Sequence, residues 1–329
     1  MKRVYISKIA RELNLKKLKI SEALNWIDWK NIVKKDARIF IKPNFTYPFY
    51  KPGVTTSPVF IEAVISVLKE YSSNITIGET NAGAHAWKAE EAFEGHNIYK
   101  IASKYNVKIV NLSNVKSEYK QVKVGSKRIM VHLPSLLINN TDIFITLPVP
   151  KVHVMTGVSL AFKNQWGCIP DVMRLKNHFS FNEYIIAINK ILKPSFALFD
   201  GTYFLNRTGP MEGDAIPMDL IIASNDIGAG SFACCEIMNL DPQKVKHLQI
   251  AKKEGLFPSS LEEIKFNSDI GKFCTCQFKL ERSVSNYMAL LAFNSKWLTN
   301  LIYISPFAIP IHRILYLIRG EPKDYKKGY

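Results

Sequence analysis

Three lysines lie next to apolar runs or turns, at positions where they could bind an anion. Lys42 follows the apolar run Ile39–Ile41, Lys163 follows Leu160–Phe162, and Lys151 follows a proline-rich turn. A lysine ammonium group is a compact point charge that binds carboxylate or phosphate oxygens. The three lysines therefore predict a site for a small anionic ligand.

Asparagines and glycines accompany the lysines. Asn44, Asn81 and Asn164 each carry donors and an acceptor, so they can orient a bound ligand. Gly201 and Gly213 lack a Cβ atom, which lets the backbone approach a ligand closely. We expect these five residues, with Lys42 and Lys151, to bind the substrate.

Candidates for the reaction itself are His153, Lys163, Glu79 and Asp200. His153 or, alternatively, His178 can transfer a proton near neutral pH. Glu79 or Asp200 can act as a base or hold a divalent metal through oxygen, and Asp226 is a further candidate metal ligand.

Structural roles compete with these functional ones. Lys42-Pro43-Asn44 can simply end a strand, and Glu79 and Asn81 can cap the segment that follows them. Asp200-Gly201 is also a common turn dipeptide. The sequence leaves these alternatives open.

Short apolar runs predict the strands that would position these groups, at residues 38–41, 74–78, 107–112, 142–147, 195–199, 218–223 and 273–280. Helices are predicted at residues 57–70, 89–105, 155–167, 182–192, 228–238 and 242–254, and an inserted β-hairpin at residues 122–131. Alternating strands and helices indicate an α/β fold with a mostly parallel central sheet flanked by helices. Ligands bind at the carboxyl edge of such a sheet, where most of the candidate residues lie.

A series of motifs in this order resembles the domain-of-unknown-function 362 family. The matching stretches are Ile41–Asn44, Gly53–Pro58, Gly78–Thr80, Leu147–His153, Thr156–Asn164 with Gly167, Asp200-Gly201, Gly209–Gly213 and Ala223–Asp226. They span residues 38–258. The resemblance implies an α/β domain but no settled activity.

Two departures from the family pattern are visible. Many relatives carry an attached ferredoxin-like iron–sulfur module, and this sequence has no ferredoxin cysteine motif. The family pattern also has a second aspartate four residues after Asp226, where this chain has Gly230. If the two acids act as a pair, the resemblance implies that half of that pair is lost.

Composition limits the function classes. The 329 residues carry a net charge of +16, which favours anionic partners. No recognisable nucleic-acid module accompanies that charge, so nucleic-acid binding is not expected. Signatures of a phosphate loop, a Rossmann dehydrogenase, an α/β hydrolase and a zinc protease are missing.

Cysteine usage bears on location and cofactors. The five cysteines are an odd number, and the first residues lack the apolar run of a signal peptide. We expect a reducing, cytoplasmic location. The sequence leaves open whether a divalent metal, or an iron–sulfur cluster with ligands from elsewhere, is bound as a cofactor. It also leaves the oligomeric state open.

The C-terminal part differs from the rest. Residues 283–318 carry only Lys296 and Arg313 as formal charges, and a basic tail follows. This segment predicts a helical extension packed on the core or, alternatively, an anchor on an anionic membrane surface through residues 283–329. We divide the chain into a helical or edge segment (1–36), a family-like domain (37–258) and this extension (259–329).

Three functional hypotheses follow. The first is an enzyme that binds a small carboxylate or phosphate at the carboxyl edge of the sheet. The second is a redox or metal-handling accessory protein, suggested by Cys168 and by the neighbouring Cys234 and Cys235. The third is a peripheral membrane protein at the inner face of the membrane, acting on a lipid-linked or envelope precursor.

Overall fold

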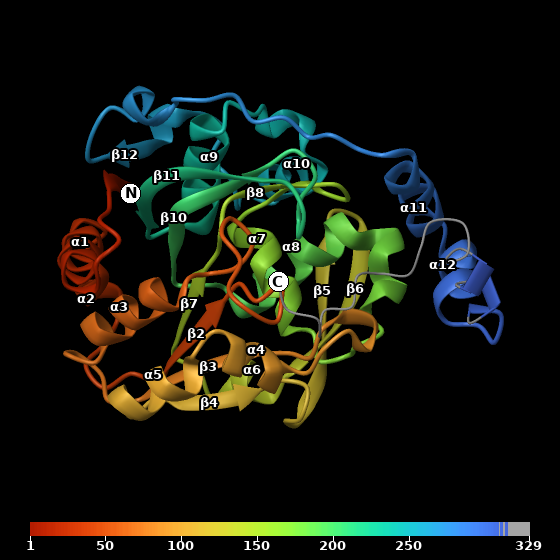
Figure 1. Cartoon of the computed structure of the whole chain (residues 1–329), viewed down its shortest axis with the longest axis horizontal. Coiled ribbons are helices and arrows are strands. Elements are labelled where there is room, and N and C mark those ends of the chain that lie inside the picture. The colour runs from red at the N-terminus through yellow and green to blue at the C-terminus, as the bar shows by residue number, and fades with distance from the viewer. Residues whose placement is uncertain (309, 312, 315–329) are drawn as a thin grey trace.

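A computed structural model describes residues 1–308, 310–311 and 313–314. Within these residues, ten strands form one sheet whose main path runs β12-β1-β11-β10-β7-β2-β3-β4 (Figure 1). Neighbouring strands from β10 to β4 are parallel, and β11 is antiparallel to both β10 and β1. The α/β class with a mostly parallel sheet is confirmed.

The strands of the sheet are β1 (Lys2–Lys8), β2 (Ile39–Pro43), β3 (Ile75–Glu79), β4 (Lys108–Asn111), β7 (Ile143–Leu147), β8 (Lys151–His153), β9 (Gly157–Ser159), β10 (Phe196–Asn206), β11 (Asp214–Ser224) and β12 (Ile264–Phe266). A separate hairpin consists of β5 (Ser117–Val124) and β6 (Lys127–Pro134). The short β8 pairs with β10 and β9 off the main path and extends the sheet at its carboxyl edge.

Helices cover both faces of the sheet. One hydrophobic cluster contains side chains of α1 (Leu13–Trp26), α3 (Pro58–Leu68), α4 (Ala89–Gly95) and α5 (Ile98–Tyr105). The other contains those of α7 (Ala161–Asn164), α8 (Phe181–Leu192), α9 (Ile227–Ile237), α10 (Lys246–Lys253) and the β5–β6 hairpin. Alternation along a strand divides residues between the two: Ile39 and Ile41 join the first cluster and Phe40 the second.

Local sequence rules explain the best-predicted helix. Ser57 caps α3 by accepting a hydrogen bond from the Phe60 N–H at 3.2 Å, and Pro58 occupies the first helical position. All eleven positions of α3 except Pro58, Val59 and Glu62 are buried. The cap and the apolar composition therefore determine this helix as expected.

Two predicted elements are wrong. The helix expected at residues 155–167 is instead β9, the single-turn α7 and the 3-10 turn Gln165–Cys168, because Gly157 has a positive φ of 82° that no helix accepts. Residues 273–280 form no strand beyond one bridge between Leu280 and Arg207. This stretch instead runs along α9, where the Phe278 N–H donates to the Met238 carbonyl group.

Helix boundaries also differ from expectation. The helix expected at residues 89–105 is interrupted, since Asn97 has a left-handed backbone between α4 and α5.

The strand β1, which the sequence did not predict, lies inside the sheet between β12 and β11. The three-part division of the chain stays a prediction, with β1 and β12 belonging to the same sheet as β2.

Two helices, α11 (Val284–Asn294) and α12 (Lys296–Tyr303), extend from the body of the molecule (Figure 1). They contact the 3-10 segment Arg174–Ser180, and the rings of Phe293 and His178 lie 4.5 Å apart. Among the described residues, no helix has the length and apolar character needed to cross a membrane. The basic tail lies outside the described residues.

Candidate functional site

A cavity of about 550 Å³ opens at the carboxyl edge of β2 and β3. Its walls come from the ends of these strands, from β8, from α7 and from the segment Arg174–Ser180, while Pro210 and Met211 from the β10–β11 loop close one side. Six of the residues that the sequence singled out line it: Lys42, Asn44, Glu79, His153, Lys163 and Asn164. The ends of β2, β3 and β8, together with α7, thus bring these groups into one cavity.

Lys42 and Glu79 form a buried ion pair across β2 and β3. The Lys42 Nζ donates to Glu79 Oε2 at 2.6 Å and to the Pro43 carbonyl group at 2.8 Å. Burial raises the pKa of the Glu79 carboxyl group, although Lys42 opposes that shift. A Cβ atom at Gly167 would lie 2.8 Å from Glu79 Oε1, so glycine is needed where the backbone passes this pair.

Lys151 has a structural position next to the cavity. Its Nζ donates to Asn44 Oδ1 at 3.1 Å and to the Val54 carbonyl group, and the side chain is fully buried. Burial lowers the pKa of Lys151 well below its usual value. Lys151 therefore fixes the loop after β2, and Asn44, which also accepts from Thr46, is the group it holds at the cavity wall.

Asn164 belongs to a chain of buried amides beneath the cavity. Its Nδ2 donates to the Lys42 carbonyl group at 3.1 Å and to Thr146 Oγ1 at 2.8 Å. Thr146 continues to Gln165, and Gln165 to Asn189. Because both Asn164 donors are used, this residue locks α7 against β2 and β7.

Lys163 is the cavity lysine without a counter-charge. In the described part of the chain, no carboxylate or hydrogen-bond acceptor contacts its Nζ, which lies 5.6 Å from the centre of the Phe181 ring. Burial and the nearby Arg174 lower the pKa of Lys163 to about 7. The amine therefore exchanges a proton near neutral pH.

Arg174 is the site residue that sequence reasoning missed. Its Nη1 donates to the carbonyl groups of Asn81, Ile169 and Asp171, at 3.0, 3.2 and 3.4 Å. No acceptor among the described residues contacts its Nε or Nη2. Arg174 follows no predicted strand, so the strand-end rule gave no signal for it.

Two histidines face the cavity in their neutral forms. His153 Nδ1 accepts from the Met155 N–H at 3.1 Å, which leaves the proton on Nε2. Burial, with Lys163 and Lys151 nearby, lowers the pKa of His153 well below 6.5. His178 Nδ1 contacts the Leu175 carbonyl group at 2.9 Å, and burial lowers its pKa to about 4.

Several predicted site residues lie away from the cavity wall. Asp200 Oδ2 accepts from the Ser57 N–H at 2.8 Å and Oδ1 from Thr202 Oγ1 at 2.7 Å, so this carboxylate anchors the start of α3. Asn81 Oδ1 accepts from the Ala89 N–H and from Asn111, which is the capping role that the sequence left open. Gly201 packs against Leu220, and Gly213, with φ 133°, shapes the β10–β11 turn.

Asp226 lies at the opposite edge of the sheet. The strand before it, β11, is antiparallel to β10, so its end meets the amino ends of the parallel strands. Asp226 Oδ1 caps α9 by accepting from the Ala229 N–H at 2.8 Å. At Gly230, a Cβ atom would lie 2.6 Å from the buried Phe199 ring. The expectation that Asp226 joins the other candidates is therefore wrong.

Buried cysteines and acidic side chains bear on the metal and redox hypothesis. In the part of the chain that the structure describes, no three His, Cys, Asp or Glu side chains are grouped as metal ligands. Cys168, Cys234 and Cys235 are buried, and burial raises the pKa of each thiol, to about 12 for Cys168. Thiolates, which would bind a soft metal, are disfavoured at these three positions.

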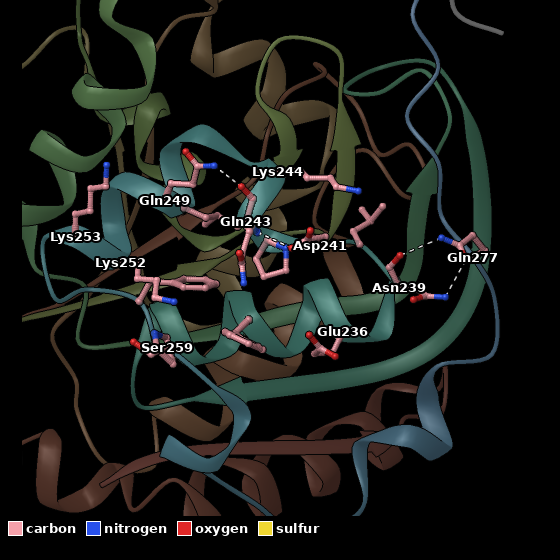
Figure 2. A pocket seen from close by; sticks show the side chains of 16 residues that line it. Glu236, Asn239, Asp241, Gln243, Lys244, Gln249, Lys252, Lys253, Ser259 and Gln277 are labelled. Carbon is pink, nitrogen blue, oxygen red and sulfur yellow. Dashed lines mark hydrogen bonds between the residues drawn. The ribbon is translucent and has the colours of Figure 1, made fainter.

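A second cavity, of about 1150 Å³, lies between α9 and α10 (Figure 2). Its wall carries Lys244, Lys252 and Lys253, and Asn239 donates to Gln277 at 2.8 Å across it. Glu236 and Asp241 also line it, so its charges are mixed. None of the residues that the sequence predicted for the site lies there.

The fold and the site thus define an α/β protein with a cationic cavity at the carboxyl edge of its sheet. The model of the family described as domain of unknown function (DUF362) matches residues 39–236, and the chain belongs to this family. The match covers every strand from β2 to β11 and every named residue of the cavity at the carboxyl edge.

Two further similarities were found. The chain is 25% identical over 241 residues to a thylakoid-associated protein of Synechocystis sp., covering 70% of this chain and 72% of that protein. A crystal structure of a Thermotoga maritima protein is similar with a TM-score of 0.41 and 14% identity, covering 70% of this chain and 59% of that one.

Proposed function

We propose that this protein is an enzyme that binds a small carboxylate or phosphate in the cavity at the carboxyl edge. Lys163 and Arg174 bind the anion, and His153 donates a hydrogen bond to it through Nε2. The pair Lys42–Glu79 is the second charged group in contact with the bound ligand.

The uncompensated positive charge of the cavity wall carries this proposal. Glu79 is the single carboxylate among the described lining residues, and it is already paired with Lys42 at 2.6 Å. Lys163 therefore has no acidic partner in the wall, and Arg174 shares the charge of Glu79 with Lys42. Burying such charges is costly unless a counter-ion accompanies them, and a bound anion supplies it.

A thermal-shift screen against organic acids and sugar phosphates tests the proposal. A ligand present at about 100 times its dissociation constant stabilises the fold by about 2.7 kcal/mol. We expect Lys163→Met, by weakening binding about tenfold or more, to reduce that stabilisation to about 1.4 kcal/mol or less, and Lys244→Met, in the second cavity, to keep it. Equal stabilisation of both variants by every ligand found would reject the cavity as the site.

A second candidate function, attachment to an anionic membrane surface, is favoured by α11 and α12. Their exposed apolar side chains are Val284, Met288, Leu291 and Trp297, which are 78, 61, 68 and 70% exposed. Lys296, the first residue of α12, lies between Leu291 and Trp297 in the sequence. Amphipathic segments of this kind bind the interface of lipid bilayers, and the Synechocystis relative is thylakoid-associated by its name.

Co-sedimentation with vesicles tests this second function. We expect binding to phosphatidylglycerol vesicles at low salt, weaker binding to phosphatidylcholine, and loss of binding in a Leu291→Ser, Trp297→Ser variant. The matched control is Tyr119→Ser on the β5–β6 hairpin, where Tyr119 is 68% exposed. If the wild-type protein stays in the supernatant with both lipids, this function is rejected.

A further inference from the structure

We propose that the ε-amino group of Lys163 forms a Schiff base with a small anionic carbonyl compound in the cavity. This inference rests on the proposed function, because Arg174 and the cavity must first bind the anionic part of that compound. The substrate would then be a 2-oxo acid or an aldehyde phosphate, which is a narrower class than the carboxylates and phosphates of the proposed function.

The position of Lys163 separates it from Lys42 and Lys151, the two buried lysines at the same edge of the sheet. Lys42 Nζ pairs with Glu79 at 2.6 Å, and Lys151 Nζ donates to Asn44 and to the Val54 carbonyl group. Lys163 Nζ, in contrast, contacts no acceptor among the described residues and lines the cavity. Its amine alone is therefore free to attack a ligand.

The surroundings of Lys163 favour the nucleophilic form of the amine. Its Nζ lies 5.6 Å from the Phe181 ring centre, and Trp166 lines the same wall. An apolar wall and a neighbouring cation are the two means by which proteins activate lysine nucleophiles. Both are present here, since Arg174 lies close enough to lower the pKa of Lys163 to about 7.

The groups around Lys163 match the parts of an anionic carbonyl compound. Nε and Nη2 of Arg174 are available for a carboxylate or phosphate, which guanidinium groups bind in a bidentate manner. His153, whose neutral ring has its proton on Nε2, faces the same cavity and can donate a hydrogen bond to the carbonyl oxygen. The ligand would thus present its carbonyl carbon to Lys163 Nζ.

The chemical step balances without an oxidant or a reductant. The neutral amine adds to the carbonyl carbon, and the proton lost from the ammonium group returns to the departing oxygen. Starting from the protonated amine, the Lys163 nitrogen forms a C=N bond to the carbonyl carbon and keeps one of its three hydrogens. The C=O bond breaks, and the oxygen leaves as water with the other two hydrogens.

Reductive trapping tests the inference. The full chain is incubated with pyruvate or glycolaldehyde phosphate at pH 7.5, reduced with cyanoborohydride, and mapped by peptide mass spectrometry. We expect labelling of Lys163 roughly a hundredfold faster than of exposed lysines such as Lys244, because far more of its amine is neutral at that pH. Lactate, which has no carbonyl group next to its carboxylate, should slow the labelling without being trapped.

Two variants sharpen the test. Lys163→Arg keeps the positive charge and should bind lactate but show no trapping, whereas Lys244→Arg should be labelled at Lys163 like the wild type. If lactate stabilises the protein and neither carbonyl compound labels Lys163 faster than Lys244, the Schiff base is rejected and anion binding stands. If lactate, phosphate and both carbonyl compounds all fail to bind, the proposed function and this inference fall together.

Discussion

Buried charges at the site have different roles that depend on their partners. Lys42 and Lys151 are both almost fully buried, yet Lys42 neutralises Glu79 while Lys151 donates to neutral oxygens of the loop after β2. Lys163 has neither kind of partner. Residue type and spacing drew attention to all three lysines, and their hydrogen bonds decide which of them can meet a ligand.

The Lys42–Glu79 pair gives the first prediction. Lys42→Met leaves the Glu79 carboxyl group buried at 5% exposure without its partner, so we expect a loss of about 3–5 kcal/mol in the free energy of unfolding. Urea denaturation measures it. The matched control is Arg38→Met, which breaks the exposed pair with Asp142 at 2.6 Å and should change stability little. Similar small losses in both variants would contradict the importance of the buried pair.

Asp200 gives a prediction that separates a structural role from a catalytic one. Asp200→Ala removes the acceptor for Ser57 and Thr202, and we expect a loss of about 3 kcal/mol in stability. Anion binding in the cavity should stay unchanged, since Asp200 does not line it. Calorimetric titration alongside urea denaturation tests both points. Unchanged stability together with lost anion binding would show that Asp200 belongs to the site.

Four of the six candidate side chains in the cavity wall could be predicted because strand ends in a parallel sheet share one edge, whereas Lys163 and Asn164 come from the short helix α7. Lys42, Glu79 and His153 illustrate this rule, as each lies at the end of a strand that faces the cavity. Arg174 could not be predicted, because it reaches the cavity from a 3-10 segment with no regular periodicity. Asp200 follows the same rule in sequence, but its carboxylate is used by the backbone of Ser57.

At the scale of elements, the direction of β11 decides at which edge of the sheet Asp226 lies. The apolar run before Asp226 predicts a strand, and β11 is that strand. Periodicity carries no information on direction, however, and β11 forms a hairpin with β10 instead of a crossover. Asp226 therefore caps α9 at the edge opposite the cavity.

Gly230 gives a prediction about the packing of α9 on the sheet. Gly230→Asp places a side chain against Phe199, which is fully buried and has no room to move. We expect a loss of about 1–3 kcal/mol in stability, measured by thermal unfolding. The control is Gly83→Ala, where a Cβ atom meets only the Val172 carbonyl oxygen at 4.0 Å. A Gly230→Asp protein as stable as the wild type would contradict this packing.

At the scale of the whole molecule, burial keeps four histidines neutral, and neighbouring positive charge adds to this effect at His153, His178 and His247. Burial lowers the pKa of His96 and His178 to about 4 and that of His247 to about 3, and that of His153 falls well below 6.5. The folded protein therefore binds fewer protons than the unfolded chain between pH 6.5 and about 4. Stability must fall as the pH is lowered through this range.

His247 tests this explanation because neither ring nitrogen has a hydrogen-bond partner among the described residues. A histidine whose pKa drops from about 6.5 to about 4 on folding lowers the free energy of unfolding by about 3 kcal/mol at a pH acid enough to protonate it. We expect His247→Met to flatten the fall in stability between pH 6.5 and 4, measured by urea denaturation at several pH values. Replacing the exposed His85 by glutamine should leave the profile unchanged.

The binding of an anion by Lys163 is the central claim, and calorimetric titration with lactate and inorganic phosphate tests it most directly. At pH 6.5 we expect Lys163→Met to weaken binding by about tenfold or more, while Lys244→Met binds like the wild type. Raising the pH to 8.5 should weaken wild-type binding of lactate, whose own charge is constant in this range, because Lys163, with a pKa of about 7, loses its proton while Arg174 stays charged and His153 and His178 stay neutral. Equal affinity in the wild type and Lys163→Met at both pH values would contradict the account.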